Sequence, residues 1–213
     1  MKALRIFLPV VFTAIIISGC ATRQITKKSA YSLSEVFSDD FSSYGIGQKA
    51  PFGEWKIKNP GSYFIESAIQ PDGTIGNVLK TDNNGIIFIP GDWKDYFFEV
   101  KTRDGEPGVF FRLTNNGNEG YYITKGLGYM TGIRLYKFAG NTKQMIAESK
   151  GFEVKGWWDV KIEVIGNTIV VYANGKKYMD IKDNDPKLSF GGVGLGSIYG
   201  GVLFDNVRVK TIK

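Results

Sequence analysis

The stretch Trp158-Asp159-Val160-Lys161-Ile162-Glu163-Val164 alternates apolar and charged side chains without a break. Successive side chains of a β-strand point to opposite faces of a sheet, so this pattern predicts a strand with one face in the core and one in water. Asn-Gly at 174–175 supplies the two positive-φ residues that a tight hairpin turn needs, and Gly-Asn at 166–167 marks another turn. The segment therefore predicts an antiparallel meander over 158–179.

Period-two patterns separated by Gly, Asn, Asp and Pro continue along the chain, and no segment shows a sustained helical stripe. We expect an all-β domain in which many short strands form two packed sheets. The glycine-rich segments 45–53 and 191–201 are expected to be loops. Besides the meander, the expected strands are 54–58, 62–66, 85–89, 96–102, 109–114, 120–124, 132–138 and 202–210.

The start of the chain has the features of a secretion signal. An almost wholly apolar run, 8–17, follows Lys2 and Arg5 and ends in Ile-Ser-Gly-Cys at 17–20. The run is shorter than the roughly 20 residues that a membrane-spanning helix needs, and small residues precede the cysteine. Cys20, the only cysteine, is predicted to carry diacylglycerol, as in the bacterial lipoproteins that this segment resembles; an ordinary signal with an incidental cysteine is the alternative.

These features predict a lipoprotein signal peptide over 1–19, a lipidated tether over 20–35 and one β-sandwich domain over 36–213. Several acyl chains, palmitate among them, would hold the mature protein at the membrane surface of a bacterial cell envelope. Residue 21 is Ala rather than the Asp that resembles an inner-membrane retention signal, so the outer membrane is favoured in a two-membrane organism.

The residue types that are missing exclude several kinds of chemistry. The chain has no histidine, so it cannot form a Ser-His-Asp triad, a Cys-His pair or a histidine-ligated zinc site. With a single cysteine it forms no internal disulfide, and hydrolysis would have to use carboxylates, Tyr, Lys or a hard cation. The net charge of +6 is spread along the sequence without a dense basic and aromatic run, which argues against a nucleic-acid partner.

A series of short motifs resembles the concanavalin A-like lectin/glucanase superfamily over 36–210, in particular its laminin-G-like branch with carbohydrate-binding modules and the 3-keto-disaccharide hydrolase domain. The resemblance implies a two-sheet jelly-roll sandwich whose concave face binds glycans in many relatives. The Glu-x-Asp-x-x-Glu motif of family 16 glucanases is missing, so their mechanism is not expected. The motifs are Asp-Asp-Phe at 39–41, Gly-Glu-Trp at 53–55, 95–100, 108–112, Gly-Tyr-Tyr at 120–122, 157–161, 172–176, 192–195 and Phe-Asp-Asn-Val at 204–207.

Eleven of the thirty aromatic residues lie between positions 93 and 138. If the aliphatic residues of strands 109–114 and 132–138 face the core, alternation places their arginines on the opposite surface. Aromatic rings there would cover the apolar face of a sugar, while Arg and Glu bind its hydroxyl or carboxylate groups. Core aromatics and a cross-strand ion pair are the alternative reading. The candidate ligand-binding residues are Arg112, Arg134 and Tyr136, joined by Glu99 or Tyr122 from neighbouring strands, with Trp93 at the rim.

Asp205 is the second candidate. It shares the parity of Leu203, Val207 and Val209, which predicts that it points inward, where a carboxylate needs hydrogen bonds or a cation. Together with Asp40 on the first strand it would form a structural calcium site. Backbone amides or basic side chains would satisfy Asp205 equally well. No other cofactor is expected.

Three functions remain open. The first is a membrane-anchored lipoprotein whose carbohydrate-binding domain holds glycan at the envelope. The second is a glycoside hydrolase or lyase with Glu99 or Glu119 as base and Arg112 stabilising oxyanion charge. The third is a non-catalytic module that packs on an envelope protein.

Overall fold

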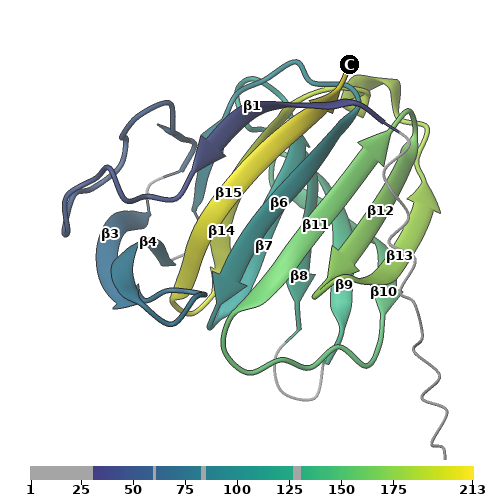
Figure 1. Cartoon of the computed structure of the whole chain (residues 1–213). Helices are drawn as coiled ribbons and strands as arrows, with labels where there is room; N and C mark the ends of the chain where they lie inside the picture. Colours follow the sequence, from purple (N-terminus) through teal and green to yellow (C-terminus); the bar gives the residue numbers. More distant parts are fainter. Residues whose placement is uncertain (1–30, 60, 83–84, 127–130) are drawn as a thin grey trace, which may run out of the picture. The chain divides into compact units, whose positions relative to one another are not determined.

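The computed structural model describes residues 31–213 except 60, 83–84 and 127–130. The predicted signal peptide, Cys20 and most of the predicted tether lie outside the described residues. The described chain folds into two antiparallel sheets packed face to face, which confirms the predicted all-β sandwich (Figure 1). No helix in this part of the chain is long and apolar enough to cross a membrane.

The first sheet has eight strands and lies in front in Figure 1. The meander predicted from 158–179 forms one edge, and β1 pairs with the C-terminal half of β15. The order is β13 (Lys176–Lys182), β12 (Thr168–Ala173), β11 (Trp158–Ile165), β6 (Tyr96–Arg103), β15 (Val202–Ile212), β4 (Ile75–Asp82) and β3 (Ser62–Ile69), with β1 (Leu33–Asp39) off this path.

The second sheet has seven strands and lies behind the first. One short 3-10 helix, Pro186–Leu188, precedes the interior strand β14. The order is β10 (Thr142–Ser149), β9 (Ile133–Ala139), β8 (Glu119–Lys125), β7 (Glu106–Leu113), β14 (Gly192–Tyr199), β5 (Ile86–Ile89) and β2 (Lys56–Ile57).

The core lies between the sheets and is filled by the apolar half of each alternating strand. On β11, Trp158, Val160, Ile162 and Val164 are at most 2% exposed, as the period-two pattern predicts. Tyr121 and Ile123 on β8 contribute to the same core from the other sheet. Residues of the opposite parity on the seven-stranded sheet consequently point to its outer face.

Strand β14 was predicted to be a loop, and that prediction is wrong. Its alternate residues Val193 and Leu195 are buried in the core, and glycines occupy the outer face between them. A methyl group on Gly194 would lie 2.8 Å from Leu113 Cδ1 and 3.1 Å from Phe88 Cβ. The glycines therefore leave room for side chains of neighbouring strands to lie on the sheet.

Other strands also differ from the prediction. β1 begins at Leu33, so residues 33–35 of the predicted tether belong to the eight-stranded sheet. Strands β4 and β10 were not predicted. Five of the eight residues of β10 are exposed, so this edge strand lacks the apolar alternation that marks a half-buried strand.

Candidate functional site

A group of aromatic side chains covers the outer face of the seven-stranded sheet. We call Phe88, Phe110, Tyr122, Tyr136 and Phe138 the outer aromatic cluster. Tyr122 and Tyr136 are directly opposite on β8 and β9, and their rings stack with centroids 4.9 Å apart and planes 9° apart. Phe110 on β7 lies 5.2 Å from Tyr122 and 5.8 Å from Phe138, also between ring centroids. Tyr136 is half-buried, so it is the cluster's partly open ring.

A row of polar side chains crosses the same face beside the cluster. We call Glu106, Thr124, Arg134 and Glu148 the polar row; they come from β7, β8, β9 and β10. Arg134 pairs in register with Thr124 on one side and Glu148 on the other. Its Nε lies 2.8 Å from a Glu148 carboxylate oxygen, and Thr124 Oγ1 donates to Glu106 over 3.4 Å. Carboxylate, guanidinium and hydroxyl groups thus stand next to Tyr122 and Tyr136.

Electrostatics couple the row to the cluster. The hydrogen bond that Arg134 donates to the Glu148 carboxylate raises the pKa of Arg134, which therefore stays charged. Burial raises the pKa of Tyr122, and the neighbouring Tyr136 and Glu106 raise it further, so its hydroxyl stays protonated. At neutral pH the face offers a fixed cation, two carboxylates and a phenol that can donate.

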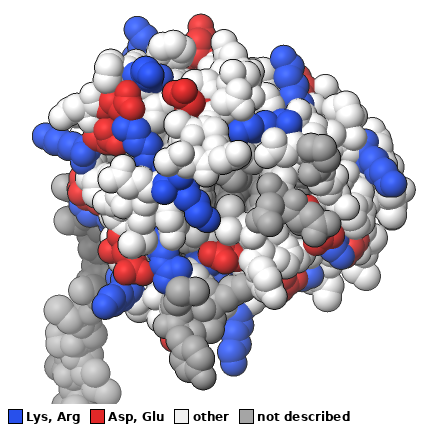
Figure 2. All heavy atoms as spheres, turned by 180° about the vertical axis from the view of Figure 1, so that it is seen from behind, with Lys and Arg blue, Asp and Glu red and all other residues white. Residues whose placement is uncertain are grey.

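The seven-stranded sheet curls round this face. Four strands separate β9 from β2, which in a flat sheet corresponds to about 24 Å. Lys58, directly after β2, nevertheless has its Nζ 5.5 Å from the centroid of Phe138 on β9. The outer face is therefore concave. Figure 2 views the molecule from this side and shows positively and negatively charged side chains interspersed with uncharged ones.

Arg112 does not lie on this face, and its predicted place there is wrong. A bulge against β14 gives Arg112 a φ of 49°, which turns Leu113 outward into the apolar side of the face. The Arg112 side chain is 4% exposed at the end of the sandwich. Its guanidinium donates to the backbone oxygens of Leu188 (2.7 Å), Lys94 (2.9 Å) and Gly166 (2.7 Å). Arg112 thus holds loops together rather than facing a ligand.

Glu99 is also misplaced by the prediction, because β6 belongs to the eight-stranded sheet. Its carboxylate pairs with Lys210 Nζ at 2.8 Å on that sheet. Trp93 packs against the core beside Tyr96 and covers its edge. Glu119 has the parity of the core-facing Tyr121 and begins β8 at the turn from β7. None of these three residues lies with the polar row.

Tyr122, Arg134 and Tyr136 do share one face, as predicted from their alternation. Sequence reasoning did not find the other polar partners, Glu106, Thr124 and Glu148. Glu148 lies on the unpredicted β10, and Glu106 precedes the residues 109–114 that carried the predicted alternation. Extending that alternation back by three residues would have placed Glu106 outward.

Comparison with known proteins decides the family. The profile of the 3-keto-alpha-glucoside-1,2-lyase-like domain matches residues 48–210. The chain belongs to this family. An uncharacterized protein of Methanocaldococcus jannaschii is similar to it over 215 residues, with 38% identity and coverage of 98% of this chain and 89% of that protein.

Solved structures share the fold at low identity. A protein of unknown function with a galectin-like fold from Bacillus subtilis aligns with a TM-score of 0.55 and 9% identity, over 86% of this chain and 100% of its own. The carbohydrate-binding module CBM66 from Bacillus subtilis aligns with a TM-score of 0.52 and 20% identity. The alignment covers 75% of this chain and 92% of that module. Domain 4 of the arabinanase AbnA from Geobacillus stearothermophilus, solved in complex with arabinotriose, aligns with a TM-score of 0.53 and 15% identity. The alignment covers 84% of this chain and 93% of that domain. The chain thus has the two-sheet sandwich fold of these proteins.

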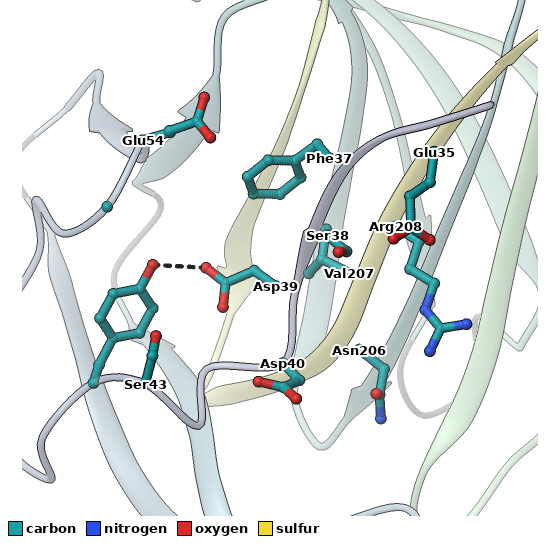
Figure 3. A pocket seen from close by; sticks show the side chains of 12 residues that line it. Glu35, Phe37, Ser38, Asp39, Asp40, Ser43, Glu54, Asn206, Val207 and Arg208 are labelled. Atoms are coloured by element: carbon teal, nitrogen blue, oxygen red, sulfur yellow. Dashed lines mark hydrogen bonds between the residues drawn. The ribbon is translucent and has the colours of Figure 1, made fainter.

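A separate pocket of about 380 Å³ lies between β1, β15 and the segment 43–54. Glu35, Asp40, Glu54 and Arg208 line it (Figure 3). Asp39 holds its wall together by accepting hydrogen bonds from Tyr44 Oη (2.9 Å), Trp55 Nε1 (2.8 Å) and the Phe41 amide (2.8 Å). Burial and the bond to Asp39 raise the pKa of Tyr44 to about 12.

Asp205 is 1% exposed, so the prediction that it is buried is confirmed. Its predicted parity with Val207 and Val209 is wrong, because a bulge at Asn206 (φ 52°) shifts the register after Asp205. Its carboxylate accepts the Asn206 amide at 2.7 Å. Within the described residues no three acidic side chains gather where a metal could bind, so calcium held by Asp40 and Asp205 stays a prediction.

Proposed function

We propose that the concave outer face of the seven-stranded sheet binds saccharide. The observation that carries this proposal is that an aromatic surface and a row of charged groups lie side by side on this face. The partly open ring of Tyr136, backed by Tyr122, lies next to the charged groups of Arg134 and Glu148. A sugar ring has an apolar face of C–H groups and an edge of hydroxyl groups, so it needs both surfaces side by side.

In this arrangement the apolar face of a sugar ring lies on Tyr136. Its hydroxyl groups donate to the carboxylates of Glu106 and Glu148 and accept from Arg134. Hydrogen bonds to charged groups stabilise by roughly 1.5–3 kcal/mol each before the cost of ordering. The stack on Tyr122 and the ion pair with Glu148 fix Tyr136 and Arg134 before a ligand arrives, which lowers that cost.

The comparisons support the proposal through the fold. Two of the similar structures are a carbohydrate-binding module and an arabinanase domain in complex with arabinotriose. Fold alone does not carry function, so the proposal depends on the residues of the outer face.

The start of the chain supports a location for this binding. We propose that Cys20 is acylated and that the domain holds glycan at the membrane surface of the cell envelope, with the outer membrane favoured where two membranes are present. Intact-mass analysis of the protein purified from its host is expected to show the acyl chains, and Cys20→Ser is expected to move the protein to the soluble fraction.

A glycan array on the detergent-solubilised full chain tests the binding proposal. We expect saturable binding that Tyr136→Ala weakens about tenfold or more, equivalent to ~1.4 kcal/mol. Tyr199→Ala is the matched control, because this tyrosine is 70% exposed at the end of β14. Equal effects of the two variants, or no binding to any saccharide, would overturn the proposal; a copurifying envelope protein would then favour an interaction module.

Family membership favours a lyase as the second candidate. Elimination across C1 and C2 of a 3-keto-glucoside requires a base that removes the proton on C2, next to the ketone, while the C1–O bond breaks and the leaving oxygen takes up a proton from water. Glu106 is the described carboxylate on the outer face that accepts a hydrogen bond only from a hydroxyl, Thr124. Incubation of a 3-keto-disaccharide with the protein is then expected to release the sugar that was linked to C1. Glu106→Gln is expected to abolish this release without abolishing binding of the disaccharide.

A further inference from the structure

Two ammonium groups lie over two rings of the outer aromatic cluster, at the end of the concave face opposite the polar row. Lys58 Nζ lies 5.5 Å from the centroid of Phe138. Lys143 is directly opposite Phe138 in the β9–β10 register, and its Nζ lies 6.0 Å from the centroid of Tyr136. The two lysines come from opposite edges of the seven-stranded sheet, since Lys58 follows the edge strand β2 and Lys143 belongs to the edge strand β10. The curl of the sheet therefore brings two like charges to the outer aromatic cluster, one over Phe138 and one over Tyr136.

Neither ammonium group has a carboxylate within 4.0 Å among the described residues. Other lysines in this part of the chain do: Lys137 contacts Asp185 at 2.7 Å, and Lys210 contacts Glu99 at 2.8 Å. Lys58 is also half-buried against the turn at Gly117, where a Cβ would meet its Cδ at 3.2 Å. Burial lowers its pKa because the charged form loses water. A partly desolvated cation without a counter-ion favours an anionic ligand.

Charge on the concave face is accordingly asymmetric. At the polar row, Glu148 neutralises Arg134 and Glu106 adds a negative charge. At the other end, Lys58 and Lys143 are unneutralised, with the outer aromatic cluster between the two ends. A ligand that lies across Tyr136 would place one end among hydrogen-bonding carboxylates and the other between ammonium groups.

We propose that Lys58 and Lys143 bind the acidic group of an anionic glycan beside Phe138, so that this face selects saccharides that carry a carboxylate or a sulfate over neutral ones. The inference rests on the proposed saccharide binding and adds its ligand class. An ammonium group binds a carboxylate or a sulfate as a point charge. The experiment therefore tests carboxylated and sulfated saccharides separately.

The test compares matched charged and neutral ligands on the full chain by isothermal titration calorimetry. An oligogalacturonide and its methyl ester differ in the carboxylate charge and the ester methyl groups. A sulfated galactan oligosaccharide and its desulfated form differ only in the sulfate. In at least one of these two pairs, we expect the acidic ligand to bind about tenfold more tightly than its neutral counterpart at low salt. Higher ionic strength is expected to reduce this preference because salt screens the charges.

Lys58→Gln combined with Lys143→Gln is expected to remove the preference while leaving affinity for the neutral ligand within about twofold. Lys150→Gln combined with Lys155→Gln removes the same net charge from exposed positions at the end of β10 and the loop that follows, and is expected to keep the preference. Equal binding of the acidic and neutral ligands would overturn the inference and leave saccharide binding standing. Binding of no saccharide would instead overturn the proposed function, and the inference with it.

Discussion

The guanidinium group of Arg112 donates a hydrogen bond of 2.7 Å to the backbone oxygen of Leu188, 76 residues further along the chain. The same group reaches the backbone oxygens of Lys94 and Gly166. One side chain thereby connects the β5–β6 loop, the β11–β12 turn and the short 3-10 helix. A buried arginine that binds only backbone oxygens has a structural role, and this role is separable from ligand binding.

Replacing Arg112 with Met is expected to lower the free energy of unfolding by about 3 kcal/mol, because backbone oxygens lose charged donors at a buried site. Urea denaturation measures the loss. Arg208→Met is the control, since this arginine is exposed and its replacement is expected to cost less than about 0.5 kcal/mol. Equal stability of the two variants would contradict the structural role, and saccharide affinity of the folded Arg112→Met protein is expected to equal that of the wild type.

Gly194 is expected to tolerate no side chain. In Gly194→Ala the new methyl group would lie 2.8 Å from Leu113 Cδ1 and 3.0 Å from the Ile87 backbone oxygen. Forcing these atoms apart is expected to cost about 1–3 kcal/mol of unfolding free energy. Gly45→Ala, where a methyl group meets nothing within 4 Å, is expected to be neutral in the same urea titration. A neutral Gly194→Ala variant would show that the outer face is less tightly packed than described.

Asp39 is expected to stabilise the wall of the pocket in Figure 3. Its two oxygens accept three hydrogen bonds, from the Phe41 amide, Tyr44 Oη and Trp55 Nε1. Asn at this position offers one acceptor oxygen, so at least one donor loses its partner, at a cost of about 1–3 kcal/mol. Urea denaturation followed by tryptophan fluorescence reports the loss. Asp39→Asn as stable as the wild type would mean that water satisfies these donors.

Alternation alone was enough to predict the sandwich and to place Tyr122, Arg134 and Tyr136 on one surface. It failed where a single residue leaves the extended conformation. Arg112 and Asn206 have φ values of 49° and 52°, and each reverses the parity of every residue that follows on its strand. No glycine marks either bulge in the sequence. Asn206 belongs to a residue type that adopts positive φ more readily than most, but Arg112 does not, and packing against the partner strand determines where each bulge forms.

The sheet to which each strand belongs was the other unpredictable feature. Only Asp104 and Gly105 separate β6 from β7, yet these strands belong to different sheets. A two-residue connection normally predicts a hairpin within one sheet. Glu99 had been expected on a strand next to that of Arg112, but the two strands lie in different sheets. Strand β14 has the reverse difficulty, since alternate glycines are typical of loops but here provide space for Phe88 and Leu113. Contacts distant in sequence decide both cases.

Asp205 is expected to make stability depend on pH. Burial raises its pKa to about 6, against about 3.9 in an unfolded chain. The folded protein therefore binds more protons than the unfolded chain between about pH 4 and 6, and the free energy of unfolding falls as the pH rises through that window. Two pH units correspond to about 3 kcal/mol. Asp205→Asn keeps an acceptor for the Asn206 amide and is expected to remove this decline.

The measurement is the difference between wild-type and Asp205→Asn unfolding free energies, taken by urea titration from pH 4 to 7.5. The difference isolates Asp205 from carboxylates such as Asp40 and Asp185, whose lowered pKa values make the protein lose stability as the pH falls. Glu153→Gln, a change at an exposed carboxylate, is expected to give a profile parallel to the wild type. If Asp205→Asn also runs parallel to the wild type, Asp205 is already ionised at pH 4, and a cation or an unrecognised basic partner must offset its burial.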